Sequence, residues 1–147
     1  MIINDIISLD RTQCAVQCNS KKRIFEIISE MAVAQSPELD QIEVLASLLA
    51  REKMGSTGIG HGIAIPHGKI KGLNNMIAVI ITTNQPIDFD AIDSKPVDIF
   101  FTILVPEEQT DKHLQALSGI AKKLSNKDTV KTIRKATTKN ELVAALI

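Results

Sequence analysis

Apolar residues in the first third of the chain recur at helical spacing. Between residues 20 and 34 they fall on one face of a helix, and Ser20 precedes them as a candidate N-cap. That apolar face consists of Ile24, Ile27, Ile28 and Met31. Pro37 then interrupts the pattern. The spacing therefore predicts a helix over residues 20–34.

A second helix is predicted directly afterwards. Asp40 followed by Glu43 is a capping-box pattern, so the helix begins at Asp40. Arg51 and Lys53 fall in its last turn, where cations suit the helix dipole, and Gly55 ends it. Its apolar face is formed by Leu45, Leu48 and Leu49.

Four stretches have the composition of strands. Cys14–Cys18 predicts a short strand, and Ile63–Ile65 another, because residues before a proline favour extended backbone. Met76–Thr83 is rich in β-branched residues. Val97–Val105 is almost continuously apolar, which is typical of a strand buried on both faces.

The C-terminal third returns to helical patterns. Residues 111–124 predict one helix, and two short helices follow, the last with a capping box formed by Thr138 and Glu141. Helices and buried strands thus alternate, and neither a repeat nor a linker interrupts them. We expect a single domain over residues 1–147, with an α/β fold and a largely covered sheet.

Charge and hydropathy exclude several classes of function. The chain has 17 basic and 17 acidic residues, so bulk charge predicts neither nucleic-acid nor anionic-membrane binding. No apolar run approaches the roughly 20 residues of a membrane span, so no membrane insertion is expected. The N-terminus has no basic region before an apolar stretch, and we therefore expect a cytoplasmic protein.

The unusual segment is GSTGIGHGIAIPHGK, residues 55–69, which holds five of the seven glycines and two of the three histidines. It does not match a phosphate-binding P-loop, because Gly68-Lys69 is followed by Ile70 and the predicted helix precedes it. Its glycine spacing and order of elements also differ from a dinucleotide-binding turn. The segment is therefore predicted to be a loop with another role.

The histidines and Ser56 do not match the sequence patterns of metal sites or of serine hydrolases. His61, His67 and His113 have no cysteine or carboxylate at ligand spacing, so we expect neither a metal nor a cofactor. Ser56 is close to His67 in sequence but is not in a nucleophile-elbow pattern. For His61 we expect a structural role.

His67 can instead act as a nucleophile that accepts a phosphoryl group on a ring nitrogen. Glycines allow backbone N–H groups to turn toward an anion, and Arg51 can bind phosphate oxygens bidentately. His113 falls in the first turn of its helix, where the dipole favours an anion. The candidate phosphate-binding residues are Ser56, Thr57 and Gly68.

These residues resemble a known family. REKMGSTGIGHGIAIPHGK is similar to the active-site segment of the enzyme IIA components of the bacterial phosphoenolpyruvate-dependent phosphotransferase system. The resemblance is to the fructose/mannitol superfamily and, within it, to the nitrogen-regulatory branch. It extends to KKRIFEIISEMA and to PIDFDAIDSKPVDIFFTILVPEEQTDKHLQALSGIAKKL, and so covers nearly the whole chain.

The resemblance implies a mixed β-sheet flanked by helices and a phosphotransferase component that relays phosphate through a phosphohistidine. It implies that His67 carries the phosphoryl group, that His113 lies beside it, and that Arg51 stabilises the phosphate. The implied donor is a nitrogen-type histidine phosphocarrier protein, and the implied partners are regulatory target proteins. It assigns no role to His61.

Two alternatives stay open from the sequence. One is a IIA component of fructose- or mannitol-type sugar uptake that passes phosphate to a separate IIB protein. The other is a non-catalytic docking module that only binds regulators. Docking alone does not require His67, Arg51 and His113 together, which favours a phosphorelay protein.

Overall fold

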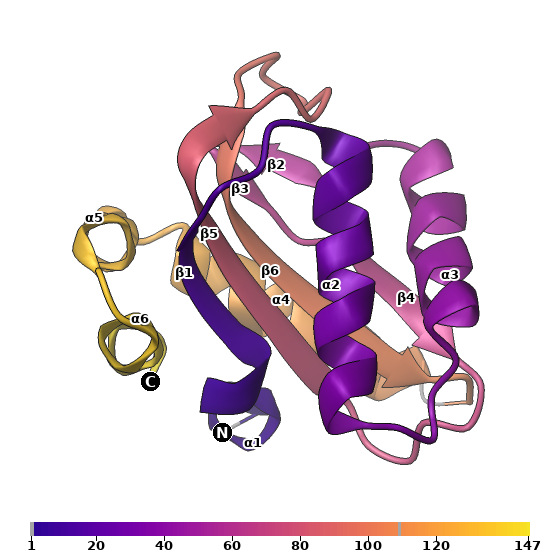
Figure 1. Cartoon of the computed structure of the whole chain (residues 1–147). Coiled ribbons are helices and arrows are strands. Elements are labelled where there is room, and N and C mark those ends of the chain that lie inside the picture. The colour runs from indigo at the N-terminus through magenta and orange to yellow at the C-terminus, as the bar shows by residue number, and fades with distance from the viewer. Residues whose placement is uncertain (1, 109) are drawn as a thin grey trace.

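A six-stranded mixed β-sheet forms the centre of the computed structural model, which describes residues 2–108 and 110–147 (Figure 1). In chain order the elements are α1 (Ile2–Ile6), the 3-10 turn η1 (Leu9–Arg11), β1 (Thr12–Val16), α2 (Lys21–Gln35), α3 (Gln41–Lys53), β2 (Gly58–Gly60), β3 (Ile63–Ala64), β4 (His67–Ile70), β5 (Ile77–Ile87), β6 (Val97–Pro106), α4 (Thr110–Leu124), α5 (Lys127–Lys135) and α6 (Lys139–Leu146). The α/β fold with a mixed sheet is confirmed.

Strand β6 organises the sheet, whose order is β1-β5-β6-β3-β2. It pairs antiparallel with β5 on one side. On the other side β3 and then β4 run parallel to it, with Ile63 opposite Ile99 and His67 opposite Ile103. Between these two short strands the carbonyl of Pro66 accepts from Ile103 N–H at 2.9 Å. His67 is therefore fixed on a strand against the centre of the sheet.

Helices cover both faces of the sheet (Figure 1). Alternation along β5 directs Val79 and Ile81 into the core beneath α2 and α3. It directs Ala78 and Ile80 into a second core with α1, α4, α5 and α6. Strand β6 contributes to both cores, so the prediction of a strand buried on both faces is confirmed.

The predicted caps position α2 and α3 over the sheet. Ser20 Oγ accepts from Arg23 N–H at 3.1 Å, and Asp40 Oδ1 accepts from Ile42 N–H at 3.0 Å. At the last helix Thr138 Oγ1 accepts from Glu141 N–H at 3.1 Å. The Glu141 carboxylate accepts from Thr137, one residue before the cap. Short-range signals thus located the starts of α2, α3 and α6 correctly, whereas Thr110, predicted from sequence as the cap of the helix over residues 111–124, is itself the first residue of α4.

The first strand was placed two residues too late. The sequence predicted Cys14–Cys18, whereas β1 is Thr12–Val16 and Cys18 lies beyond it. Within β1, Ala15 has φ +54°, and the pairing register with β5 shifts between Gln13 and Val16. Such a bulge is set by the partner strand and has no strong local signal.

The predicted strand at Ile63–Ile65 is confirmed as β3, but the rest of residues 55–69 was predicted as loop and also contains β2 and most of β4. Pairing of β2 with β3, and of β4 with β6, overrides the weak strand propensity of glycine here. No helix among the described residues has both the length and the apolar character needed to cross a bilayer.

Candidate active site

His67 begins β4, and its half-buried ring is oriented by its own backbone. Nδ1 lies 3.0 Å from the carbonyl oxygen of Ile65. Because a carbonyl only accepts, Nδ1 must carry the ring proton in this contact. The lone pair of the neutral imidazole is then on Nε2. The backbone thereby selects which ring nitrogen can act as a nucleophile.

Arg51 lies in the last turn of α3 and reaches that lone pair. Its Nε donates to His67 Nε2 at 3.2 Å, and its Nη1 donates to the carbonyl of Gly55 at 2.7 Å. The guanidinium is thus held between the helix end and the imidazole. Among the described residues no acceptor lies within hydrogen-bond distance of Nη2, so part of the guanidinium can bind an incoming anion.

His113 approaches from the first turn of α4. Its ring centroid is 5.0 Å from that of His67, with the ring planes at 79°, an edge-to-face arrangement. The structure therefore brings together three residues that are distant in sequence, His67, Arg51 and His113. They come from a strand and from two helices on opposite faces of the sheet (Figure 1).

The surroundings of both imidazoles favour the neutral form, because they lower the pKa of His67 and of His113. Burial lowers the pKa of His67, and the Arg51 cation lowers this pKa further, while the Ile65 hydrogen bond and the Glu52 carboxylate partly oppose the shift. Burial also lowers the pKa of His113, aided by His67, Lys69 and Arg51. A neutral imidazole is the nucleophilic form, so these shifts favour covalent chemistry near neutral pH.

Glu52, the residue after Arg51, is the centre of an ionic network that the sequence prediction missed. Glu52 Oε1 accepts from the backbone and side chain of Thr57 at 3.0 and 2.6 Å. Its Oε2 lies 2.8 Å from Lys21 Nζ, and the Glu52 side chain is only 6% exposed. An acidic residue in the last turn of a helix opposes the helix dipole. That unfavourable position was the signal that could have identified Glu52.

The predicted phosphate-binding residues stand elsewhere in the hydrogen-bond network. Ser56 Oγ donates to the carbonyl of Phe89 at 3.1 Å, and the Thr57 hydroxyl donates to Glu52. A Cβ on Gly68 would lie 2.6 Å from Ser47 Oγ, so this glycine allows α3 to pack closely on β4. Each hydroxyl has a single proton, and in the structure that proton is used within the fold.

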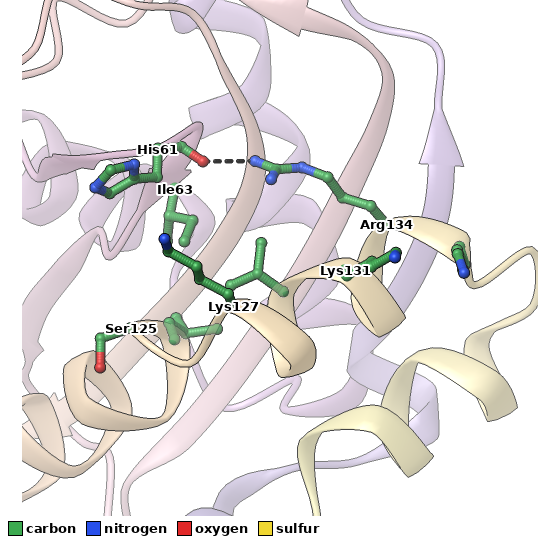
Figure 2. Close-up of a pocket in the computed structure, with 9 residues that line it drawn as sticks. His61, Ile63, Ser125, Lys127, Lys131 and Arg134 are labelled. Carbon is green, nitrogen blue, oxygen red and sulfur yellow. Dashed lines mark hydrogen bonds between the residues drawn. The ribbon is translucent and has the colours of Figure 1, made fainter.

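His61 is in a different place from the histidine pair. With Gly62 it forms the two-residue turn between β2 and β3, and its φ is +57°. Its N–H donates to Asp93 Oδ2 at 3.0 Å, and its carbonyl accepts from Arg134 at 2.6 Å (Figure 2). Within the described residues, no group of three histidine, cysteine or acidic side chains is arranged to hold a metal ion.

Comparisons with known proteins identify the family of this chain. Residues 5–147 match the family model of the phosphoenolpyruvate-dependent sugar phosphotransferase system, EIIA 2. A nitrogen regulatory protein of Klebsiella oxytoca is 46% identical over 141 residues, covering 95% of this chain and 86% of the relative.

Solved structures extend the comparison. The crystal structure of nitrogen regulatory protein IIA-Ntr from Neisseria meningitidis matches with a TM-score of 0.93 and 37% identity, covering 100% of both chains. IIA mannitol from Escherichia coli shares the fold with a TM-score of 0.79 at 17% identity, over 96% of this chain and 99% of that one. This chain therefore belongs to the EIIA 2 family of the phosphoenolpyruvate-dependent sugar phosphotransferase system and, within it, to the nitrogen regulatory IIA-Ntr proteins.

Proposed function

We propose that this protein accepts a phosphoryl group on Nε2 of His67 from a nitrogen-type histidine phosphocarrier protein, and regulates target proteins according to its phosphorylation state. The observation that carries the proposal is the pairing of Nδ1 with the Ile65 carbonyl, which leaves the Nε2 lone pair facing Arg51. Family membership supports phosphotransfer in general.

The transfer step is a nucleophilic substitution at phosphorus. The Nε2 lone pair of His67 forms the new N–P bond, and the N–P bond of the donor phosphohistidine breaks, with its electron pair returning to the donor imidazole. The proton stays on Nδ1, where the Ile65 carbonyl stabilises the positive charge that the ring gains. No base or metal ion is required for this step.

Arg51 and His113 stabilise the transferred group. The guanidinium gives up its contact with Nε2 and donates to the phosphoryl oxygens, which are stronger acceptors because they are charged. His113 lies at the edge of the ring, in the first turn of a 15-residue helix whose dipole favours an anion. Its role is to assist onward transfer more than uptake.

Apolar side chains beside the site support docking of a protein donor. Met54 follows the helix of Arg51 and is 83% exposed, while Leu114 follows His113 and is 63% exposed. Ile92, at 83%, lies in a loop whose N–H bonds to Gly58 of the glycine segment. Exposed apolar residues on the segments that carry the site residues fit a protein interaction surface.

Regulation would follow from charge. A phosphoryl group adds roughly −2 charge at neutral pH, which is enough to change which proteins bind this surface without refolding the sheet. We propose the cytoplasm as the site of action, where phosphocarrier and targets meet. The nitrogen-regulatory relatives support this signalling role in preference to sugar uptake.

The decisive experiment is intact mass spectrometry after incubation with phosphoenolpyruvate, enzyme I and the phosphocarrier. Wild type should gain one acid-labile phosphoryl group, and His67→Ala should gain none. His61→Ala is the matched control, since His61 is also a histidine of the glycine segment but is tied to Asp93 and Arg134. Uptake by folded His67→Ala, or none by wild type with a charged carrier, would contradict the proposal. Efficient transfer to a sugar-type IIB protein would favour sugar uptake.

A further inference from the structure

A second candidate site lies outside the histidine pair. A cleft of about 550 Å³ opens between the β2–β3 turn and the α4–α5 junction. Its apolar lining is Ile63, Leu124 and Val130, and none of His67, Arg51 and His113 lines it. Figure 2 shows His61 on one side and Lys127, Lys131 and Arg134 on the other. Its volume is within the roughly 300–1,000 Å³ typical of small-ligand sites.

The wall formed by α5 and the end of α4 is strongly basic. Residues 122–135 contain six of the 17 basic residues but only one acidic residue, Asp128. The rest of the chain has 11 basic and 16 acidic residues, a formal charge of −5. Four of the six basic residues line the cleft, namely Lys127, Lys131, Arg134 and Lys135, and Arg134 is paired with Asp98. The three lysines therefore give this wall a local positive charge that attracts anions.

The spacing of the lysines adds to this argument. Lys127, Lys131 and Lys135 all line the cleft and are four residues apart on one face of α5. Like charges at this spacing destabilise a helix by about 0.2–0.5 kcal/mol per pair. Within residues 2–108 and 110–147, no carboxylate lies within ion-pair distance of any of the three. A bound anion would relieve this repulsion.

Arg134 has a different role in the same wall. It donates to both carboxylate oxygens of Asp98, at 2.9 to 3.2 Å, and to the carbonyl of His61. These bonds fix the guanidinium and tie α5 to the turn between β2 and β3. The cleft thus lies between two anchored elements, and its lining combines exposed lysines with the buried side chains of Ile63, Leu124 and Val130.

We propose that this cleft binds a small organic anion with a compact apolar body. The carboxylate, phosphate or sulfonate head lies against Lys127, with Lys131 adding positive charge to the same wall, and the apolar body packs on Ile63, Leu124 and Val130. The concave apolar base favours a small molecule over an extended polyanion, which would need a wider basic surface. The proposal is independent of phosphate transfer at His67.

Amide NMR with three probes tests the proposal on the free protein. Naphthalene-2-carboxylate has both an anionic head and an apolar body, its carboxamide has the same body without charge, and acetate has the charge without the body. We expect saturable shifts with the carboxylate in residues 61–63 and 124–135. The carboxamide and acetate should each bind at least tenfold more weakly. If the carboxamide or acetate bound as tightly as naphthalene-2-carboxylate, or if the shifts were centred on His67, the proposal would be overturned.

Charge reversal provides the second arm. The double variant Lys127→Glu, Lys131→Glu should bind naphthalene-2-carboxylate at least tenfold more weakly. Glutamate at position 127 is compatible with the fold, because an acidic residue is favourable at the start of a helix. Lys22→Glu with Lys71→Glu is the matched control, because both lysines are exposed and neither lines the cleft. An equal loss in the control would show that only bulk charge matters, and would contradict the site. Binding of an acidic peptide here, with none of naphthalene-2-carboxylate, would replace it with a protein-docking surface.

Discussion

Replacing Glu52 with glutamine tests whether a buried charge supports the active site. The amide keeps the size of the carboxylate and an oxygen for Thr57, but presents either a weaker acceptor or a donor to Lys21 Nζ. In the wild type this carboxylate receives two hydrogen bonds from Thr57 and faces the ammonium at 2.8 Å. The substitution therefore removes charge without creating a cavity.

The magnitude follows from these contacts. Removing one partner of a buried ion pair costs about 3–5 kcal/mol. Lys21 is 26% exposed and also donates to the carbonyl of Phe89, so solvent and this second acceptor recover part of the loss. Hydrogen bonds to charged groups contribute about 1.5–3 kcal/mol, and those from Thr57 become weaker without the charge. We expect Glu52→Gln to lower the free energy of unfolding by about 3 kcal/mol, or roughly 6–12 °C in melting temperature.

The assay is urea unfolding of wild type, Glu52→Gln, Lys21→Met and the double variant, with the rate of phosphate uptake measured on each. The double variant should be less destabilised than the sum of the single ones, because neither charge is left unpaired. Uptake should slow in Glu52→Gln, since residues 55–57 hold Arg51 through the Gly55 carbonyl. Glu30→Gln, in an exposed ion pair, is the control. Additive losses, or Glu52→Gln as stable as the control, would refute the reasoning.

Three further predictions concern the site and its frame. Phosphate uptake should persist below pH 6.5 and decline only as the pH falls through the lowered pKa of His67. Below pH 6.5 the folded state binds fewer protons than the unfolded state, so the free energy of unfolding should also fall as the pH falls. This fall should be smaller in His67→Gln, and acid titration of both proteins measures it. Gly68→Ala should cost about 1–3 kcal/mol in urea unfolding, partly restored by Ser47→Ala, because the new Cβ meets Ser47. His113→Ala should slow onward transfer more than uptake in single-turnover assays; complete loss of uptake by a folded variant would contradict this role.

The helix starts were predictable from sequence because their signals are local. Ser20, Asp40 and Thr138 each satisfy backbone donors two or three residues away, so the chain itself contains both partners of the contact. The long apolar strand at residues 97–105 was equally clear, since burial on both faces requires apolar residues at nearly every position.

The glycine segment was predicted only in part, as the strand at Ile63–Ile65, because the rest of its structure depends on partners about 36 residues away. Ile63 pairs with Ile99, and His67 with Ile103, and no local pattern within residues 55–69 encodes that register. The tight packing of Gly68 on Ser47 is likewise a contact between two elements. Sequence identified the candidate histidine, while the Ile65 carbonyl, positioned by the fold, determines which of its nitrogens is available.

Under the proposed phosphotransfer, the contact between Arg51 and His67 explains how one cation could serve both the free and the phosphorylated state. In the free state Nε donates to Nε2 at 3.2 Å, at the long end of the hydrogen-bond range, so little is lost when the contact breaks. The same cation disfavours protonation of the ring and so preserves the lone pair that attacks phosphorus. Once the N–P bond forms, the guanidinium can exchange a weak neutral acceptor for charged oxygens, which are stronger partners. Arg51 therefore favours the phosphorylated state over the protonated one, and this difference is what a phosphohistidine carrier needs near neutral pH.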